Sequence, residues 1–249
     1  MDKMFPTMID RPENPNIISS IFYCLLAFWT LPFLLLLFMQ GSFQNPVTLA
    51  WGDIAYHIIN FLMALVIYRN YLAESFLNVQ ADFKQVLTYA LIAAALMCTV
   101  MMTYLLGYLA TGMDLLSLAA FGTLPIAEVE LFVLSSEVIH QVPLFGTLCM
   151  TILTPVSISC LYYATAFAPG SCSKPWLGYV LVALILAFPR VCNAVTYWNP
   201  AEELQLYLIQ LPLHLFACWS YQKADTVWAP VISLSITNLA ASLFLRLLF

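Results

Sequence analysis

Charged residues are scarce in this chain of 249 residues: they make up 8% of it, whereas 63% is hydrophobic. Soluble domains carry about 25% charged residues, which they need to cover a surface that faces water. A chain with so little charge cannot expose most of its area to water. The composition therefore predicts a polytopic membrane protein, although the length alone would allow one or two soluble domains.

The sequence also lacks basic clusters, paired cysteines and the motifs of several common enzymes. The formal net charge of −5 is spread over the connections, which argues against a nucleic-acid partner. None of the seven cysteines belongs to a CxxC pair, so no disulfide framework is indicated. HExxH, GxSxG and GxxxxGK[ST] are absent, and so is GxxxG. We therefore expect no cofactor.

Seven apolar segments are long enough to cross the ~30 Å hydrocarbon core of a membrane as helices. The first shows no small-residue cleavage site after a short apolar core, so we expect it to be retained and not removed as a signal peptide. The predicted fold class is all-α, a polytopic bundle of seven spans. These spans cover residues 17–39, 51–70, 86–112, 143–168, 175–196, 203–222 and 227–248.

Outside these spans, lysine and arginine occur only on alternate connections, which indicates the orientation of the bundle. The connections at 40–50, 113–142 and 197–202 contain neither residue. We therefore expect a cytoplasmic N-terminus and, with an odd number of spans, a C-terminus outside. The basic residues on the other connections are Lys3, Arg11, Arg69, Lys84, Lys174 and Lys223.

Two connections need their own interpretation. Residues 71–84 are too polar to span, and we expect an amphipathic helix or a loop on the cytoplasmic face. Residues 113–142 are mostly apolar but include Glu128 and Glu130, and an eighth span there would invert the charge alternation downstream. We therefore expect an outer-surface or re-entrant helix. This divides the chain into a cytoplasmic tail (1–16), N-terminal spans with an outer amphipathic segment (17–142) and a helical core (143–249).

Ionisable side chains at membrane depth are costly and are functional candidates by default. Arg190 lies near the outer end of its span, where it either snorkels toward Glu202 or Glu203 or points inward and closes a polar cavity. His214 lies in the middle of the next span. A hydrogen bond to a neighbouring helix is a commoner role there than metal binding.

Two further polar patterns could carry chemistry. Asp53, His57 and Asn60 lie at offsets of four and three on one helical face, and they form either a polar stripe facing the bundle or the outer end of the second span. Glu130, Glu137 and His140 are separated by seven and three positions, so they project from nearly one face of a helix. Such a set could hold a divalent metal or share a proton. We favour the simpler interpretation, the solvated outer face of an amphipathic helix.

The run QKADTVWAPVISLSITNLAASL carries a more specific pattern. It resembles the end of the CPBP family, the CAAX-protease and bacteriocin-processing membrane proteins also called Abi proteins. Members end in a basic–Thr–Gly turn, a Trp-Ala-Pro entry and a helix with His-x-x-x-Asn or His-x-x-x-Asp. Trp228, Ala229 and Pro230 match the entry, and Asn238 falls at the family's Asn. Leu234 stands where the family has its His.

Two upstream segments extend this resemblance over residues 143–245. KPWLGYVLVALILAFPRVCN resembles the helix bearing Phe-x-x-x-His, with Arg190 at the His, or Cys192 in a register shifted by two. LTPVSISCLYYATAF resembles the segment bearing Glu-Glu-x-x-x-Arg. Ile158 and Ser159 stand where the two glutamates belong, and Tyr163 stands at the arginine.

In family members the glutamates and histidines are thought to activate a water or bind a metal for peptide hydrolysis inside the membrane. Isoleucine, serine and leucine cannot act as the required base, and arginine is never neutral in a protein. The resemblance therefore implies a bacterial membrane protein whose core has no catalytic residues left. Asn238 would be the remaining polar group of the former cavity, with Ser233, Ser235 and Thr237 around it, and such side chains can join helices by hydrogen bonds.

Three functions follow from these observations. The first is a non-catalytic scaffold that binds a partner membrane protein or a lipidated peptide, with Arg190, His214 and Asn238 as binding residues. The second is an active endopeptidase of the CAAX-protease type that uses zinc or a proton relay; its candidates are Glu128, Glu130, Glu137, His140 and His214. The third is a transporter or channel subunit with helices broken at prolines; the candidate breaks are Pro155, Pro189 and Pro212.

Overall fold

The computed structural model describes residues 16–31, 34, 46–111, 149–197 and 200–248. Within these ranges every element is a helix and no strand occurs, which confirms the all-α class. The helices outside the centre are α1 (Ile17–Leu25), continued by the π-helical η1 (Leu26–Thr30), α3 (Pro46–Ile67), α4 (Arg69–Ala81), α5 (Phe83–Thr111), α12 (Pro175–Tyr197), α13 (Pro200–Ala224) and α14 (Trp228–Leu248).

A continuous helical segment at the centre of the molecule, residues 149–173, changes its winding three times. We call this segment the central helix. It consists of η2 (Cys149–Leu153), α10 (Thr154–Ile158), η3 (Ser159–Phe167) and α11 (Ala168–Ser173), of which η2 and η3 are π-helical. Together with the outer helices it places one helix on each of the seven segments predicted from the sequence.

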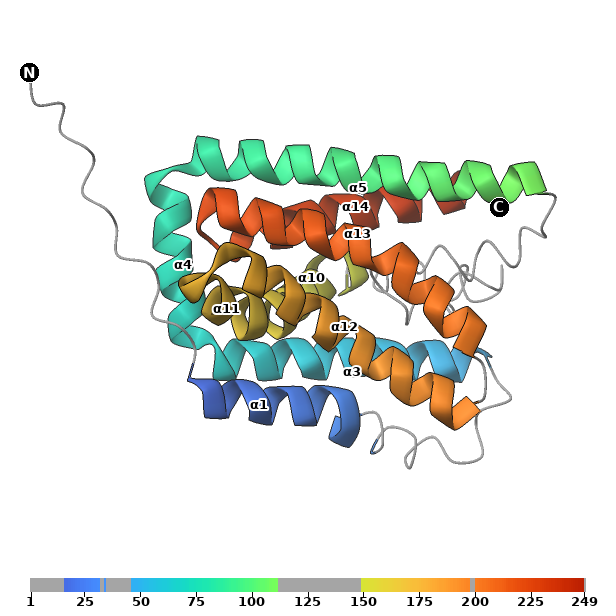
Figure 1. The fold of residues 1–249 in the computed structure, drawn as a ribbon, viewed down its shortest axis with the longest axis horizontal. Helices are drawn as coiled ribbons and strands as arrows, with labels where there is room; N and C mark the ends of the chain where they lie inside the picture. Colours follow the sequence, from blue (N-terminus) through green and yellow to red (C-terminus); the bar gives the residue numbers. More distant parts are fainter. Residues whose placement is uncertain (1–15, 32–33, 35–45, 112–148, 198–199, 249) are drawn as a thin grey trace, which may run out of the picture.

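The central helix is surrounded by the other helices (Figure 1). On one side α14 packs against α10, and α5 packs outside α14 and against α13. On the other side α3 packs against α10, and α1 lies beyond α3. The remaining helix, α12, contacts η3, α11 and α13. The central helix therefore provides the surface on which helices from both halves of the chain meet.

Helix α4 crosses one end of the bundle between α3 and α5 (Figure 1). It is the helix that we predicted as one of two possibilities for residues 71–84. One face of it is buried, through Tyr71, Leu72, Ser75 and Val79. This face is bonded to the turn between α13 and α14, because the Thr226 hydroxyl donates to the Ser75 carbonyl at 3.0 Å.

Two prolines explain the winding of the central helix. Pro155 and Pro169 have no N–H to donate, and in an α-helix the ring of each would clash with the carbonyl four residues earlier. In both cases a π-helical stretch ends just before the proline, at Leu153 and at Phe167. The wider π-helical turn moves the obstructing carbonyl away from the proline ring. Within η3 the Thr165 hydroxyl also donates a hydrogen bond to the Cys160 carbonyl at 2.8 Å. Helices α12 and α13, in contrast, continue through their prolines.

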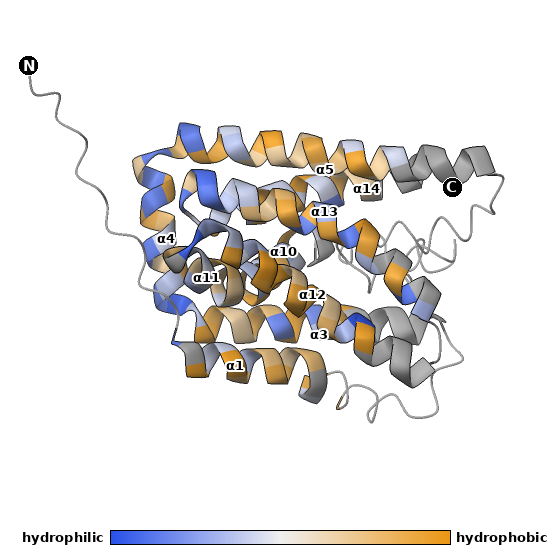
Figure 2. Cartoon of the chain, viewed as in Figure 1, coloured by the Kyte–Doolittle hydropathy of each residue, from blue (hydrophilic) through white to orange (hydrophobic). Residues whose placement is uncertain are grey.

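Two helices in the described ranges are long and apolar enough to cross a membrane, namely Phe83–Thr103 of α5 and Thr151–Cys172 of the central helix. The other apolar helices are shorter by the same measure; they are Ile18–Phe28, Ile54–Ile67, Pro175–Val191 and Trp228–Ala241. Hydrophilic residues gather where α4 crosses the bundle, and the middle of the helices is mostly hydrophobic (Figure 2). Hydrophilic and hydrophobic residues are therefore separated along the helix axes.

Candidate functional site

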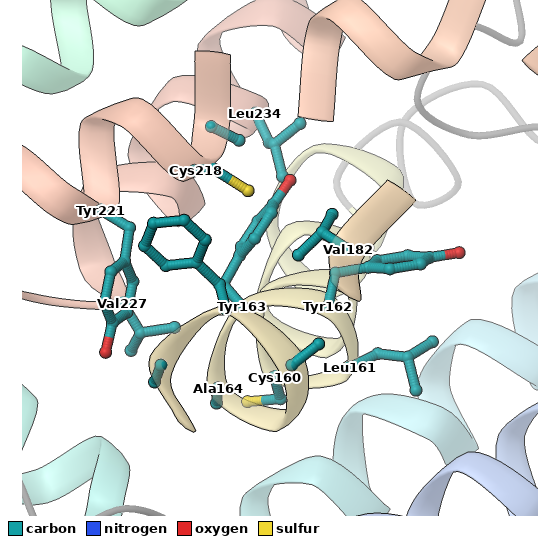
Figure 3. Close-up of a cluster of buried hydrophobic side chains, with 14 of the residues drawn as sticks. Cys160, Leu161, Tyr162, Tyr163, Ala164, Val182, Cys218, Tyr221, Val227 and Leu234 are labelled. Carbon is teal, nitrogen blue, oxygen red and sulfur yellow. The ribbon is translucent and has the colours of Figure 1, made fainter. Parts of the chain in front are cut away.

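A hydrogen-bonded tyrosine–histidine pair lies in the middle of the bundle. Tyr163 projects from η3 toward Leu234 and Cys218 (Figure 3), and its hydroxyl lies 2.8 Å from Nδ1 of His214 on α13. Both side chains are almost completely buried, at 0% and 1% exposure. The ring of Tyr162 lies against the same imidazole, with 4.7 Å between the ring centroids. The predicted hydrogen bond of His214 to a neighbouring helix is therefore confirmed.

This pair can exchange a proton along one hydrogen bond, since either the phenol or the imidazole can be the donor. General acid–base catalysis needs more: a positioned substrate and, in the triad arrangement, a third group that orients the imidazole. Among the described residues no group of three or more His, Cys, Asp or Glu side chains could hold a metal ion. The pair by itself is a bond between two helices.

An ion pair joins α12 to α13. Arg190 of α12 and Glu203 of α13 have Nη1 and Oε2 3.3 Å apart, with side chains 13% and 16% exposed. This matches the predicted approach of Arg190 to Glu203. Glu203 precedes His214 by eleven residues on α13, about 16 Å along the helix axis, so the ion pair and the tyrosine–histidine pair are separate links between helices.

The other positions singled out by the CPBP resemblance also face inward. Ser159, Leu234 and Asn238 are buried, at 0%, 1% and 2% exposure. Ile158 is half-buried and packs on the main core. The contacts of α10 with α14 and of η3 with α12 bring the three segments of the resemblance against one another. What occupies their meeting point is an apolar core, which includes Phe167, Leu186, Leu213 and Leu234.

The small hydroxyl residues near Asn238 do not act as we expected. The Ser233 hydroxyl donates to the Pro230 carbonyl at 3.0 Å, and the Thr237 hydroxyl donates to the Ser233 carbonyl at 2.8 Å. Both acceptors lie on α14 itself, three or four residues earlier, where a short hydroxyl side chain is satisfied locally. Thr237 also approaches α5, where its hydroxyl lies 3.5 Å from Met97 Sδ.

Tyrosines provide the hydrogen bonds between helices that we had expected from serine and threonine. The Tyr68 hydroxyl lies 2.6 Å from the Thr165 hydroxyl of η3. The Tyr71 hydroxyl bonds to that of Tyr221. The pKa of Tyr71 is raised well above its usual value, mainly by burial and secondly by the neighbouring Tyr221. We did not predict this pattern; the signal was 13 tyrosines in a chain with few charged side chains.

The polar stripe predicted on the second span faces the bundle. His57 and Asn60 are buried, at 2% and 4% exposure. The Tyr23 hydroxyl donates to Oδ1 of Asn60 at 2.7 Å, and the rings of Tyr56 and His57 are 5.1 Å apart. This confirms the first of the two interpretations, in which the stripe joins α3 to α1 and to the interior.

The acidic candidates Glu128, Glu130, Glu137 and His140 lie outside the described residues, as does Asp2–Pro15 of the expected N-terminal tail. The metal-site hypothesis therefore stays a prediction. Comparisons with protein-family models, curated proteins and solved structures give no match to this chain. The CPBP resemblance accordingly rests on the quoted residues and their spacing.

Proposed function

We propose that this chain is an integral membrane protein of seven spans, with a CPBP-like core in residues 143–249 that does not hydrolyse peptides. Its role is to act as a scaffold for a partner membrane protein or a lipidated peptide, in what we take to be a bacterial cell membrane. The N-terminus, α4 and the α13–α14 turn lie on the cytoplasmic side in this proposal.

Support for the membrane location comes from the outward faces of the helices. On α12 the side chains Trp176, Val180, Leu184 and Phe188 recur every four residues and are 42–60% exposed. Residues at this spacing form one stripe along a helix. Helices α1, α3 and α5 also expose large apolar side chains. Monomeric soluble proteins rarely expose apolar patches beyond a few hundred Å², whereas a hydrocarbon environment suits such surfaces.

The non-catalytic proposal depends on which side chains lie where the three segments of the CPBP resemblance are in contact. The positions of the family's glutamates hold Ile158 and Ser159, and the position of one histidine holds Leu234, all turned inward. His214, a buried base of the described core, is already bonded to Tyr163. Hydrolysis needs a water beside a base, and the side chains of this pair are 0–1% exposed.

A cleavage and binding assay tests this proposal directly. The protein is reconstituted in liposomes with a farnesylated peptide that ends in Cys-aliphatic-aliphatic-X. We expect no product by mass spectrometry beyond the protein-free control, together with saturable retention of the intact peptide or of a defined partner protein. Cleavage that is lost in the His214→Ala variant would contradict the proposal and favour the active endopeptidase.

Chemical labelling of a native cysteine tests the membrane orientation separately. Cys172 is exposed, its thiol donates to the Ala168 carbonyl at 3.2 Å, and it lies in the connection before α12 that we place in the cytoplasm. In sealed right-side-out vesicles a membrane-impermeant maleimide should label this thiol only after permeabilisation, with Cys172→Ser as the control for other thiols. Equal labelling in intact vesicles would reverse the orientation.

A transporter or channel subunit is the second candidate function. The observation that favours it is the winding of the central helix, because π-helical turns occur frequently at functional sites and broken helices mark many transporters. The proposal predicts solute flux across protein-containing liposomes. Flux that is abolished when Pro155 is replaced by Ala, with the fold retained, would favour this candidate over the scaffold.

A further inference from the structure

Exposed basic side chains surround the end of the bundle that α4 crosses. Arg69 is the first residue of α4, and Lys84 is the second residue of α5. Lys174 directly precedes α12, and Lys223 lies in the last turn of α13. No ion pair joins any of them to another residue of the described ranges. We call these residues the basic ring.

The acidic side chains described at the same end already have partners. Asp82 lies between α4 and α5, and its Oδ1 accepts a hydrogen bond from the backbone N–H of Gln85 at 3.2 Å. Glu74 and Asp225 also have interactions of their own. The basic ring therefore provides the charges that are available to a partner at this end of the bundle.

The lysines of the basic ring lie at one level along the bundle. Helix α13 packs against both α5 and α12. At their ends Gln85 Nε2 of α5 donates to the Lys223 carbonyl of α13 at 2.9 Å. The Tyr179 hydroxyl of α12 donates to Gln222 Oε1 of α13 at 2.7 Å. These bonds fix the ends of the helices side by side, so their lysines surround the bundle instead of meeting in one pocket.

Aromatic side chains follow the basic ring toward the middle of the helices. Trp176 is 58% exposed and Phe76 is 46% exposed. Tryptophan and tyrosine are enriched where a membrane meets water, because their rings have an apolar body and a polar atom. Two ring pairs and a single ring make up what we call the aromatic belt: Tyr89 with Trp219, Phe76 with Trp228, and Trp176.

The order of side chains along the helices is that of a membrane interface. On α12 the order from the end inward is Lys174, Trp176 and then Val180, which is 42% exposed. On α13 Lys223 and Trp219 lie in the same order, four residues apart and so on one stripe of the helix. A long basic side chain extends to the headgroups, an aromatic ring lies below it, and aliphatic side chains face the hydrocarbon.

From this arrangement we infer that the partner of the α4 end is a leaflet of anionic phospholipids whose phosphates bind the basic ring. The aromatic belt then lies at the level of the glycerol and ester groups. Attraction between a basic side chain and an anionic leaflet falls off within a Debye length, and the basic ring lies directly at this surface. Phosphatidylcholine brings a cation with each phosphate, so it neutralises the ring less well. The inference rests on the proposed membrane location and adds the class of lipid and the depth.

The first test measures which lipids surround the protein. The protein is reconstituted in vesicles with equal parts of phosphatidylcholine and phosphatidylglycerol of the same acyl chains. It is then extracted with its neighbouring lipids in polymer-bounded nanodiscs, and these lipids are quantified by mass spectrometry. We expect more phosphatidylglycerol than in protein-free nanodiscs, and less enrichment as salt is added. Equal lipid ratios with and without protein would overturn the inference.

Two sets of variants show whether the basic ring causes this enrichment. Replacing every member of the ring with Gln should return the lipid ratio to that of protein-free nanodiscs. The matched control keeps each positive charge and changes its shape, through Lys→Arg at 84, 174 and 223 and Arg69→Lys, and it should retain the enrichment. Undiminished enrichment in the Gln variant would overturn the inference, and so would loss of enrichment in the charge-preserving control.

The depth of the aromatic belt has its own test in Trp176. A variant keeps this residue and has Phe at the other five of the six tryptophans. Its fluorescence is measured in vesicles of phosphatidylcholine brominated either near the headgroup or near the chain end. We expect stronger quenching by the lipid brominated near the headgroup. Stronger quenching by the other lipid would overturn this inference alone, whereas no quenching by either lipid would contradict the membrane location itself.

Discussion

The two helices that are long and apolar enough to cross a membrane occupy opposite environments. Of the apolar stretch Phe83–Thr103 in α5, 28% is buried, whereas 78% of Thr151–Cys172 in the central helix is buried. Helix α5 lies at the edge of the bundle (Figure 1) and exposes Leu91, Leu96 and Met102. Length and apolar composition therefore do not indicate which of two such helices is exposed at the edge of the bundle and which one forms its core.

The two helices differ in the side chains that they bury. The buried side of α5 is lined by alanines, including Ala90, Ala93 and Ala94, so α14 can approach closely. The central helix instead buries Tyr163 and Phe167 together with hydroxyl residues. Each neighbour of the central helix must fit around these large rings. We expect the same substitution to cost more stability there than on α5.

The largest effect is expected where α12 passes the central helix. A Cβ atom on Gly178 would lie 2.9 Å from the Phe167 carbonyl oxygen and 2.8 Å from its ring, and a backbone oxygen cannot move aside. Gly178→Val should therefore lower the free energy of unfolding by about 3 kcal/mol, the upper part of the usual range for overpacking. Ala95→Val on the exposed side of α5 is the control. Unfolding in detergent with rising SDS measures both, and equal stability of the two variants would contradict this packing.

A second pair of variants compares the two helices directly. Ala164 of η3 is 0% exposed, and Ala95 of α5 is exposed. Replacing Ala164 with Leu inserts three carbons into a filled core and should cost about 2 kcal/mol. Replacing Ala95 with Leu should change stability by less than about 0.5 kcal/mol. Thermal unfolding followed by circular dichroism gives both values, and a larger loss for Ala95→Leu would reverse the assignment of core and edge.

The seven helical segments could be predicted from the sequence because their apolar runs are long and end at polar or proline-containing connections. The sequence also indicated that His214 bonds to a neighbouring helix, since a lone imidazole at such depth needs a partner, but it left the inward position of His57 as one of two possibilities. It could not indicate that Tyr163 is this partner of His214, because a π-helical turn moves side chains away from α-helical spacing. The local bonds of Ser233 and Thr237 are also invisible in a sequence, as a hydroxyl can donate within its own helix or across to another.

Removal of one hydroxyl from each helix sharpens the comparison further. Tyr163→Phe deletes the hydrogen bond to His214 and keeps the ring, so we expect a loss of about 0.6 kcal/mol and at most ~1.7 kcal/mol. Tyr89 of α5 has a ring contact with Trp219 and no described hydrogen bond, so Tyr89→Phe should leave stability unchanged. The two variants are compared by unfolding in SDS. Indistinguishable curves would mean that the tyrosine–histidine bond contributes nothing to the fold.

The smallest effect is expected for hydroxyls that bond to their own helix, and here the two helices should behave alike. The Ser157 hydroxyl donates to the Thr154 carbonyl at 2.9 Å, and the Thr99 hydroxyl donates to the Ala95 carbonyl at 2.8 Å. Neither bond joins two helices, so Ser157→Ala and Thr99→Val should each stay within about 0.5 kcal/mol of the wild type. A loss above this limit for Ser157→Ala alone would mean that the hydroxyl also binds α3 or α14. The central helix would then have a further hydrogen bond to a neighbouring helix at α10, in addition to those of Tyr163 and Thr165.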